Sequence, residues 1–322
     1  MINLKLSFTI DEQNTGRTLS AFLLAMRDMS HRLICRMKHD RRIHVNGIAQ
    51  RTNFVLSLGD LVELYVDIDK FKNGMLSEDL SLDIVFEDDS LFAVNKRPGM
   101  IVHPVAQHQS GTVANGIAHL LELRGFPPVV RPLSRLDRDT SGILLFAKNA
   151  FIQESMIRQM SNEGFTKRYF AVVHGDASKA VAGGAGFTGS DGLERSAVTT
   201  IDLPIARKPG SIMHREVNES GRHAITHFSV LASNSEASLL DVRIETGRTH
   251  QIRVHLTHIG FPIIGDDLYY PEAPNNFGMS RQALHSYSLS FVHPFLKEAM
   301  ELTAPMPEDM KELLERLDLR TN

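Results

Sequence analysis

Hydrophobic and polar positions along the chain divide it into many short strands and fewer amphipathic helices. Apolar residues that alternate with polar ones, or short continuous apolar runs, indicate strands, whereas a spacing of three and four indicates helices. The predicted strands are residues 61–66, two strands within 82–95, 143–146, 167–175, 222–228, 239–244 and 283–286, and the predicted helices are residues 19–27, a segment after Ser30, 113–123, 151–160 and a segment after Pro307. This mixture predicts the α+β class rather than a doubly wound parallel sheet.

The N-terminal part of the chain combines a basic helix with a hairpin. Ser30 is a suitable N-cap for a helix that buries Leu33, Ile34 and Met37 on one side. Asn46-Gly47, after a short alternating run, is a strong signal for a hairpin turn. This arrangement leaves Arg32, Arg36 and Lys38 open to solvent or phosphate, and Arg41 and Arg42 follow them as further candidates for RNA binding.

Charge is distributed unevenly along the chain. Residues 17–51 hold eight Arg or Lys against two Asp, a local charge of +6 on a chain whose net charge is −3. A basic patch on an otherwise acidic chain is typical of a module that binds nucleic-acid phosphates. The alternative is a basic face that is merely solvated.

Composition and length predict two domains in a reducing compartment. The chain has 322 residues and a single cysteine, Cys35, so no disulfide within the chain is possible. Cys35 lies among apolar and basic residues, which predicts a buried thiol rather than a nucleophile. Residues 67–79 are mostly polar and read as a linker, which places the domain boundary near residue 75. No signal-peptide core or membrane-spanning run is present in the sequence, so we expect a cytoplasmic protein that does not associate with membranes.

The most conspicuous charged stretch precedes the predicted strand 143–146. Asp137 lies between Arg135 and Arg138. A partly desolvated carboxylate needs cationic or hydrogen-bonding partners of this kind to stay ionised. This arrangement suits catalysis, and it suits a structural ion pair equally well. Residues 139–142, Asp-Thr-Ser-Gly, are similar to the active-site turn of aspartic proteases, but that chemistry needs a second copy, which the sequence lacks.

Two patterns that elsewhere mark cofactor or metal sites lack their usual context here. Residues 184–189 match G-x-G-x-x-G, but neither a preceding strand nor a following helix is predicted, so we interpret them as a surface loop. His250, His255 and His258 do not have the spacing of a zinc helix, and His103 has no ligand set around it. We therefore expect no metal.

Three separated motifs carry a resemblance to the RluA-type pseudouridine synthases. They are Arg135-Leu136-Asp137 with Thr140-Ser141-Gly142, the segment 167–175 (K-x-Y-x-A-x-V-x-G) and the segment 247–256 (G-R-T-H-Q-I-R-V-H-L). Ser134 stands where that family usually has histidine. In addition, residues 14–66 resemble the S4 RNA-binding domain. Together these resemblances imply residues 1–75 as an S4-like domain plus linker, and residues 76–322 as a catalytic domain with the pseudouridine synthase fold, a mixed and largely antiparallel sheet with flanking helices.

The resemblance also implies roles for individual residues. Asp137 is the expected catalytic carboxylate, acting either as a nucleophile on C1′ or as a base on the ribose. Tyr169 is expected to stack on the target base, and Arg253 to pair with Asp137, with no metal or cofactor needed. Further residues expected to contact RNA are His103, Arg135, Arg138, Lys167, Arg168 and Arg248, besides the basic residues of the N-terminal part.

The resemblance finally implies a substrate. We expect a monomer that converts specific uridines to pseudouridine in structured RNA, and an S4 domain before such a catalytic domain favours 23S ribosomal RNA. Transfer RNA is the alternative substrate. A non-catalytic RNA-binding or ribosome-assembly protein is the alternative from another class, and it predicts the loss of Asp137, Tyr169 or Arg253, all of which are present.

Overall fold

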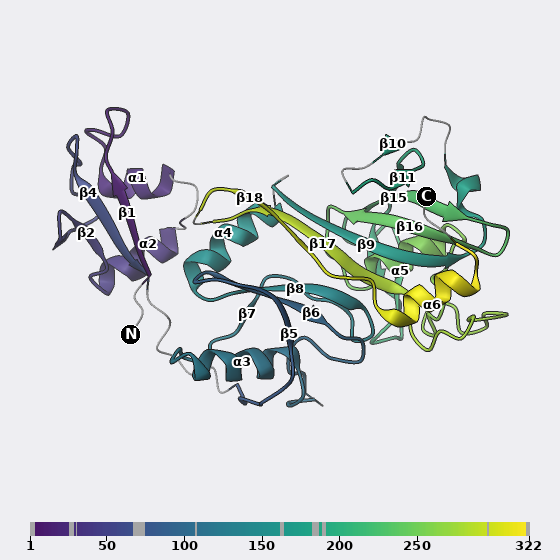
Figure 1. Ribbon diagram of the computed structural model, residues 1–322. Coiled ribbons are helices and arrows are strands. Elements are labelled where there is room, and N and C mark those ends of the chain that lie inside the picture. The colour runs from purple at the N-terminus through teal and green to yellow at the C-terminus, as the bar shows by residue number, and fades with distance from the viewer. Residues whose placement is uncertain are drawn as a thin grey trace.

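The computed structural model consists of a small N-terminal unit beside a long, twisted sheet (Figure 1). The residues that it describes are 4–25, 29, 31–66, 75–106, 108–161, 164–181, 187–188, 191–294 and 296–319. The predicted N-cap Ser30, most of the predicted linker and most of the glycine-rich segment 184–189 lie outside these residues.

The small unit is a four-stranded sheet with two helices. Its strands are β1 (Leu4–Thr9), β2 (Ile43–Val45), β3 (Ile48–Ala49) and β4 (Leu61–Val66), in the order β1-β4-β2-β3, and its helices are α1 (Leu19–Ala25) and α2 (His31–His39). Leu33, Ile34 and Met37 are the buried residues of α2, as the helical spacing predicts. Strand β1 was not predicted, although Leu4, Leu6 and Phe8 alternate with polar residues; it pairs with β4, about fifty residues further along the chain.

The predicted turn between β2 and β3 is present. Asn46 and Gly47 have φ values of 51° and 79°, the left-handed conformation that a two-residue hairpin turn requires. The Asn46 side chain also donates to Asp60 Oδ1 at 2.8 Å and accepts from the Leu61 amide at 2.8 Å. These bonds fix the hairpin to the start of β4.

The large sheet contains ten strands and is mixed but largely antiparallel. Its order is β12-β15-β16-β9-β17-β8-β6-β5, with β18 beside β17 and β7 beside β8, and only the β17–β8 pair is parallel among the described strands. Its strands are β5 (Asp83–Glu87), β6 (Leu91–Lys96), β7 (Arg131–Pro132), β8 (Ser141–Ala147), β9 (Phe165–His174), β12 (Thr199–Asp202), β15 (Ile225–Ser233), β16 (Ala237–Ile244), β17 (Leu284–Val292) and β18 (Ala299–Thr303).

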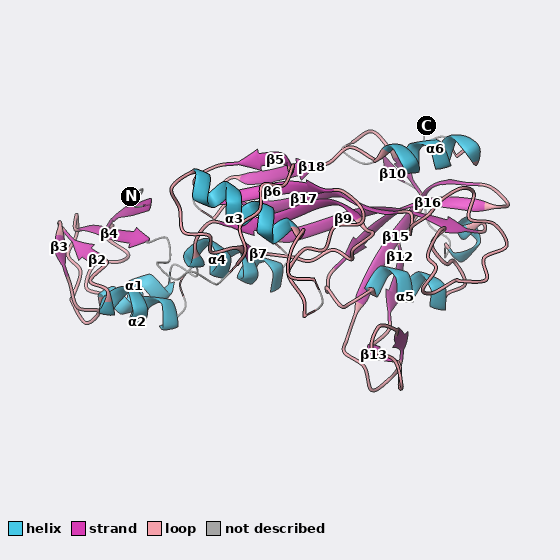
Figure 2. Ribbon diagram, turned by 90° about the horizontal axis from the view of Figure 1, so that it is seen from below, coloured by secondary structure: helices cyan, strands magenta, loops and turns pink. Residues whose placement is uncertain are grey.

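Helices and two hairpins surround the sheet (Figure 2). The helices are α3 (Val113–Leu123), α4 (Ala150–Ser161), α5 (Gln251–His258) and α6 (Glu308–Arg316), with a 3-10 turn at Ala177–Ala180. The hairpins are β10 (Phe187–Thr188) with β11 (Glu194–Arg195), and β13 (Ile205–Arg207) with β14 (Arg215–Val217). None of the helices among the described residues is long and apolar enough to cross a membrane.

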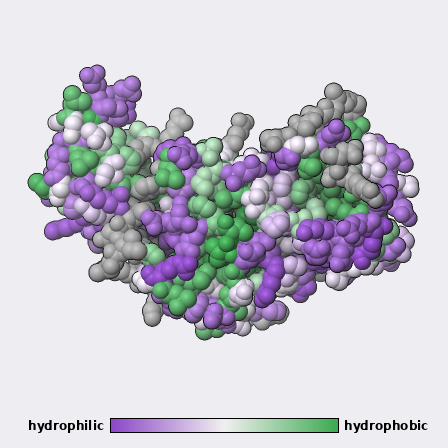
Figure 3. Space-filling view, viewed as in Figure 1, coloured by the Kyte–Doolittle hydropathy of each residue, from purple (hydrophilic) through white to green (hydrophobic). Residues whose placement is uncertain are grey.

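Hydrophobic side chains gather in separate clusters along the sheet. One cluster lies between α3 and strands β6 and β8, and another joins α5 and α6 to strands β9, β15 and β16. In the space-filling view, hydrophobic residues cross the middle of the molecule between more hydrophilic ends (Figure 3).

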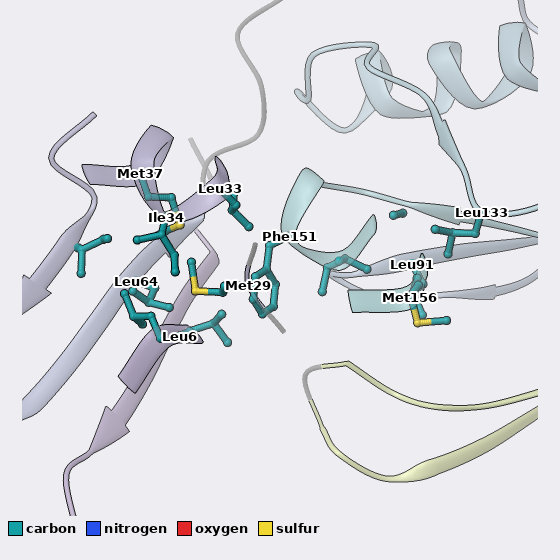
Figure 4. Close-up of a cluster of buried hydrophobic side chains, with 14 of the residues drawn as sticks. Leu6, Met29, Leu33, Ile34, Met37, Leu64, Leu91, Leu133, Phe151 and Met156 are labelled. Atoms are coloured by element: carbon teal, nitrogen blue, oxygen red, sulfur yellow. The ribbon is translucent and has the colours of Figure 1, made fainter. Parts of the chain in front are cut away.

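A further hydrophobic cluster joins the small unit to the large sheet. Phe151 and Ile152 of α4 belong to the same buried cluster as Met29 and Leu33 of the small unit. Figure 4 shows the Phe151 ring beside the side chains of Met29 and Leu33. Phe151 is only 2% exposed and shares this cluster with Met29 and Leu33, so the small unit packs against α4.

Two predictions about local structure were wrong. Cys35 is exposed, because the buried face of α2 is formed by Leu33, Ile34 and Met37, and position 35 points away from it. The strand expected over 222–228 begins only at Ile225 and continues to Ser233, paired with β12 and β16.

Candidate active site

A cavity of about 640 Å³ lies on the large sheet where four separated segments of the chain meet. Its walls come mainly from residues 101–105, from the loop 132–140, from the N-terminal half of β9 and from the segment 244–253 at the start of α5. Asp137, Tyr169 and Arg253 all line it. The three residues expected to perform the chemistry are therefore neighbours in space.

The loop that carries Asp137 is fixed by the way β8 begins. β8 runs parallel to β17, with Ser286 opposite Gly142. A Cβ atom on Gly142 would lie 2.1 Å from the Ser286 carbonyl oxygen, and its φ of 110° also disfavours other residues. Only glycine lets β8 approach β17 so closely directly after the loop.

Two buried basic side chains, Lys96 and Arg281, hold the backbone after Asp137. Lys96 Nζ donates to the carbonyl oxygens of Arg138 at 2.7 Å, Met100 at 3.0 Å and Arg97 at 3.0 Å. Burial lowers the pKa of Lys96 to about 7. Arg281 donates to the carbonyl oxygen of Asp139 at 3.1 Å. The direction of the Asp137 side chain is thus set by contacts to the two residues that follow it.

Arg281 is in turn anchored to the C-terminal helix. Its Nε and Nη2 atoms donate to the two oxygens of Asp309, at 2.7 and 2.8 Å. Gln282, the next residue, donates to the Thr140 hydroxyl at 3.2 Å. Helix α6, which was predicted only as a packing element, therefore also supports the loop around Asp137.

Arg253 connects two carboxylates. Its Nη1 donates to Asp137 Oδ2 at 3.1 Å, and its Nε and Nη2 form a two-pronged contact with Asp266, at 2.7 Å each. Burial opposes the charge of Arg253, but the bonds to Asp266 and the charge of Asp137 outweigh it and raise the pKa of the guanidinium. A permanent cation thus faces Asp137, whose side chain is 26% exposed while that of Asp266 is fully buried.

Tyr169 and Lys167 face the cavity from alternate positions of β9. Tyr169 is 6% exposed. Its burial, reinforced by the nearby charge of Asp137, raises the pKa of the phenol, which stays protonated. Burial also lowers the pKa of Lys167 to about 8, so its ammonium is still charged at neutral pH. The wall thus offers an aromatic ring beside a cation.

Arg168 does not reach the cavity. It lies between Lys167 and Tyr169 on β9, so its side chain points to the opposite face of the sheet. There it pairs with Asp241 of β16, which also binds Arg195. The interpretation of Arg168 as a residue of the RNA-binding cleft is therefore not supported by its position.

The other candidate RNA contacts around the cavity differ in their surroundings. Arg135 is exposed at the rim and His103 lines the wall, where burial and the charge of Arg135 lower its pKa. Arg248 also lines the cavity and donates to the His223 carbonyl at 2.9 Å. The guanidinium of Arg138 bonds to Asp139, not to Asp137 as its flanking position suggested.

The basic residues of the small unit lie on and after α2. Arg32, Arg36, Lys38 and Arg41 are exposed. Arg42 is half-buried, and burial lowers the pKa of its guanidinium. The helix thus presents a basic face on the side opposite its buried residues.

Sequence reasoning missed three residues of the cavity region. Asp266 holds Arg253, the Tyr269 ring lies 5.0 Å from the Arg253 guanidinium, and His250 Nε2 lies 3.9 Å from Asp137 Oδ1. The Gly265-Asp266 pair was visible as part of the third motif, but nothing in its spacing indicated the carboxylate's partner. His250 was considered only as a metal ligand.

The three histidines of the 250–258 segment point in different directions. His250 lines the cavity, His255 is buried and contacts Thr226 and the Leu203 carbonyl, and His258 is exposed. Within the described part of the chain, no three His, Cys, Asp or Glu residues are grouped to hold a metal ion.

Comparisons with known proteins agree on one family. The sequence pattern of RNA pseudouridylate synthases matches residues 90–258. The uncharacterized RNA pseudouridine synthase YlyB of Bacillus subtilis is 38% identical over 97% of this chain and 98% of its own length. The ribosomal large subunit pseudouridine synthase D of Escherichia coli is 32% identical over 97% of this chain and 94% of its own. The structure titled human RNA pseudouridylate synthase domain containing 4 shares the fold, with a TM-score of 0.55 at 22% identity over 74% of this chain and 94% of that one.

Proposed function

Because this chain belongs to the RNA pseudouridine synthase family and is an enzyme that isomerises uridine to pseudouridine in RNA, we propose that Asp137 is its catalytic carboxylate. The observation that carries this proposal is the asymmetric environment of the carboxylate. Asp137 lines the cavity, and Arg253 holds its Oδ2 at 3.1 Å, while Oδ1 lies 3.9 Å from the imidazole Nε2 of His250, beyond hydrogen-bond distance. A carboxylate with one fixed oxygen keeps the other in a defined place for reaction.

The reaction moves the ribose from N1 to C5 of the same base. The uridine leaves its stack and enters the cavity. Asp137 then acts on the sugar, either as a nucleophile at C1′ or as a base on the ribose, and the N1–C1′ bond breaks. In both cases Arg253 holds the Asp137 carboxylate in a fixed direction through the bond to Oδ2.

Tyr169 is the residue that we propose for holding the base. Its ring forms part of the cavity wall near Asp137, and stacking of a base on an aromatic ring contributes about 1–3 kcal/mol. A detached uracil held in this way can rotate and present C5 without leaving the site.

Backbone phosphates are the proposed partners of the basic residues around the cavity. Lys167, Arg135, Arg248 and His103 line it, and Arg138 lies on the same loop as Asp137. These contacts position the RNA without reading its sequence.

We further propose that residues 1–75 form an S4-like RNA-binding domain plus linker, and residues 76–322 the catalytic domain of a monomeric enzyme. The support is the pair of helices packed on a small sheet, with Arg32, Arg36, Lys38, Arg41 and Arg42 on and after α2. A basic helix face of this kind binds the phosphates of structured RNA.

Large-subunit ribosomal RNA is the substrate that we propose. Several relatives that align over most of their length carry the name ribosomal large subunit pseudouridine synthase D, at 31–32% identity. The test is pseudouridine mapping of total RNA from cells with and without this gene. Loss of discrete sites in large-subunit ribosomal RNA is expected. Losses confined to transfer RNA would overturn the substrate but keep the chemistry.

A further inference from the structure

His250 occupies the cavity in an unusual backbone conformation. It is the N-cap of α5 with a φ of 57°, in the left-handed region, and its side chain makes no capping bond to the helix. A non-glycine residue in this region is held there at a cost of about 1–3 kcal/mol, and such residues cluster at functional sites. This conformation therefore indicates a function for the imidazole in the cavity.

Tyr269 fixes the orientation of the His250 ring. The Tyr269 hydroxyl oxygen lies 2.8 Å from His250 Nδ1 and accepts the backbone N–H of Arg215 at 3.0 Å. We assign the phenol as the donor to Nδ1, an arrangement compatible with the Arg215 N–H on the same oxygen. The hydrogen of the neutral imidazole then lies on Nε2, which is also the tautomer that the negative charge of Asp137 favours.

The surroundings keep this imidazole neutral. Burial lowers the pKa of His250, and the cations Arg253 and Arg215 lower it further, against the opposing charges of Asp137 and Asp266. Tyr269 stays protonated, because burial raises the pKa of its phenol. At neutral pH the cavity thus contains an uncharged N–H donor that forms no ion pair with the carboxylate.

The position of this donor matches the leaving group of the reaction. His250 Nε2 lies 3.9 Å from Asp137 Oδ1, too far for a hydrogen bond but close enough that a ribose in contact with Oδ1 also approaches the imidazole. The O2 atom of uracil is bonded to C2, next to N1, and is the carbonyl oxygen nearest to C1′. Negative charge develops on N1 and O2 when the N1–C1′ bond breaks.

We propose that His250 is a further catalytic residue, whose Nε2–H donates a hydrogen bond to O2 of the departing uracil. This inference rests on the proposed function of Asp137. The electron pair of the N1–C1′ bond moves into the uracil ring, and His250 stabilises the resulting anion without losing its proton. The anion then attacks C1′ through C5, the C5 proton leaves to water and N1 takes a proton from water, so no other reactant is needed.

The first experiment compares single-turnover rates of variants on unmodified target RNA. His250→Ala is expected to lower the rate about 100-fold with RNA affinity within about threefold, as for the loss of one donor to a developing anion. His250→Gln can place an amide N–H near the position of Nε2, and it should retain most of the rate. His258→Ala, an exposed histidine on the same helix, is the matched control and should behave as wild type.

The second experiment replaces the proposed acceptor. An RNA with a single 2-thiouridine at the mapped target carries sulfur, a weaker acceptor, in place of O2. If His250 donates to O2, the ratio of the rates on uridine and 2-thiouridine should fall about tenfold from wild type to His250→Ala, because the two changes remove the same interaction. His250→Gln should keep the wild-type ratio.

The outcomes separate this inference from the function on which it rests. An unchanged ratio in His250→Ala, or an unchanged rate, overturns the role of His250 while wild-type enzyme still forms pseudouridine. A wild-type enzyme that forms no pseudouridine, or an active Asp137→Asn variant, overturns the proposed function instead. Loss of folding in His250→Ala would appear in its circular dichroism, and His250→Phe, which keeps a planar ring but has no N–H donor, then takes its place: a wild-type rate or ratio in that variant overturns the role of His250.

Discussion

Arg253 gives two hydrogen bonds to Asp266 and only one to Asp137. The buried carboxylate of Asp266 therefore fixes the guanidinium, and the guanidinium in turn positions the carboxylate at the cavity. Asp266 Oδ1 also accepts the amides of Leu268 and Tyr269, at 3.2 Å each, so the same residue orders the turn that carries Tyr269.

Asp266→Asn should damage both stability and activity. Removing one partner of a buried ion pair leaves the charge of Arg253 poorly compensated and should lower the free energy of unfolding by about 3 kcal/mol. The displaced guanidinium should reduce kcat by about 100-fold. Urea denaturation and pseudouridine formation measure these effects. The control is Asp267→Asn, since Asp267 is exposed; equal effects in both variants would refute the anchoring role.

Asp137→Asn should abolish turnover, because an amide is neither a nucleophile nor a base for the ribose. The amide has nearly the same shape, so RNA affinity should stay within about threefold of wild type. Single-turnover assays and filter binding measure the two quantities. A fully active variant would mean that another residue performs the chemistry.

Gly142→Ala should destabilise the fold strongly. The new methyl group would collide with the Ser286 carbonyl oxygen between β8 and β17, and the backbone there has a φ of 110°. We expect a loss of about 3 kcal/mol or more in the free energy of unfolding. Gly99→Ala is the control, because Gly99 also has a positive φ of 83° but has open space around it. It should cost only about 1–2 kcal/mol, and equal losses would argue against the collision.

Lys96 should make stability depend on pH. Its folded-state pKa is lowered from 10.5 to about 7, so between these pH values the unfolded chain binds more protons than the folded one. The contribution of Lys96 to the free energy of unfolding therefore increases as the pH rises from about 7 towards about 10. The free energy of unfolding of wild type minus that of Lys96→Met should increase over this range in urea titrations. A constant or falling difference would contradict the lowered pKa.

The basic face of α2 should contribute to RNA binding through phosphates. Each of Arg32→Ala and Lys38→Ala should weaken binding and reduce the slope of log affinity against log salt concentration by about 0.9. Lys311→Ala, an exposed lysine on α6 that pairs with Glu308, is the control and should leave the slope unchanged. Equal slopes in all variants would mean that α2 is only a solvated face.

Much of the fold follows from local patterns in the sequence. Helix α3 and strand β4 were predicted with their observed limits, because periodicity and caps define such elements within a few residues. The pairing of β1 with β4 could not be predicted, since it depends on residues far apart in sequence. Cys35 was misjudged from its neighbours, although the helical spacing already placed it off the buried face.

The candidate site likewise combines features that the sequence predicts with features that only the folded chain reveals. The cavity brings Asp137, Tyr169 and Arg253 together, as the three motifs implied. Arg168 could have been excluded from the cleft by the alternation of side chains along β9, because Tyr169 is its immediate neighbour. The contact of His250 with Tyr269 joins the start of α5 to a turn nineteen residues later, and only the folded chain reveals it.

The hydrophobic contacts around Phe151 have a consequence for affinity. Because the small unit is packed on α4, an RNA bound to the basic face of α2 is held at a restricted distance from Asp137. Once the phosphates are bound to α2, the target uridine reaches the cavity within the same complex. Its effective concentration there is set by the distance between α2 and Asp137 rather than by the concentration of free RNA. Two individually weak contacts can thus give strong overall binding, but only for RNAs whose phosphates and target uridine match that spacing. Selectivity for a particular RNA shape would then follow from avidity, without any base being read outside the cavity.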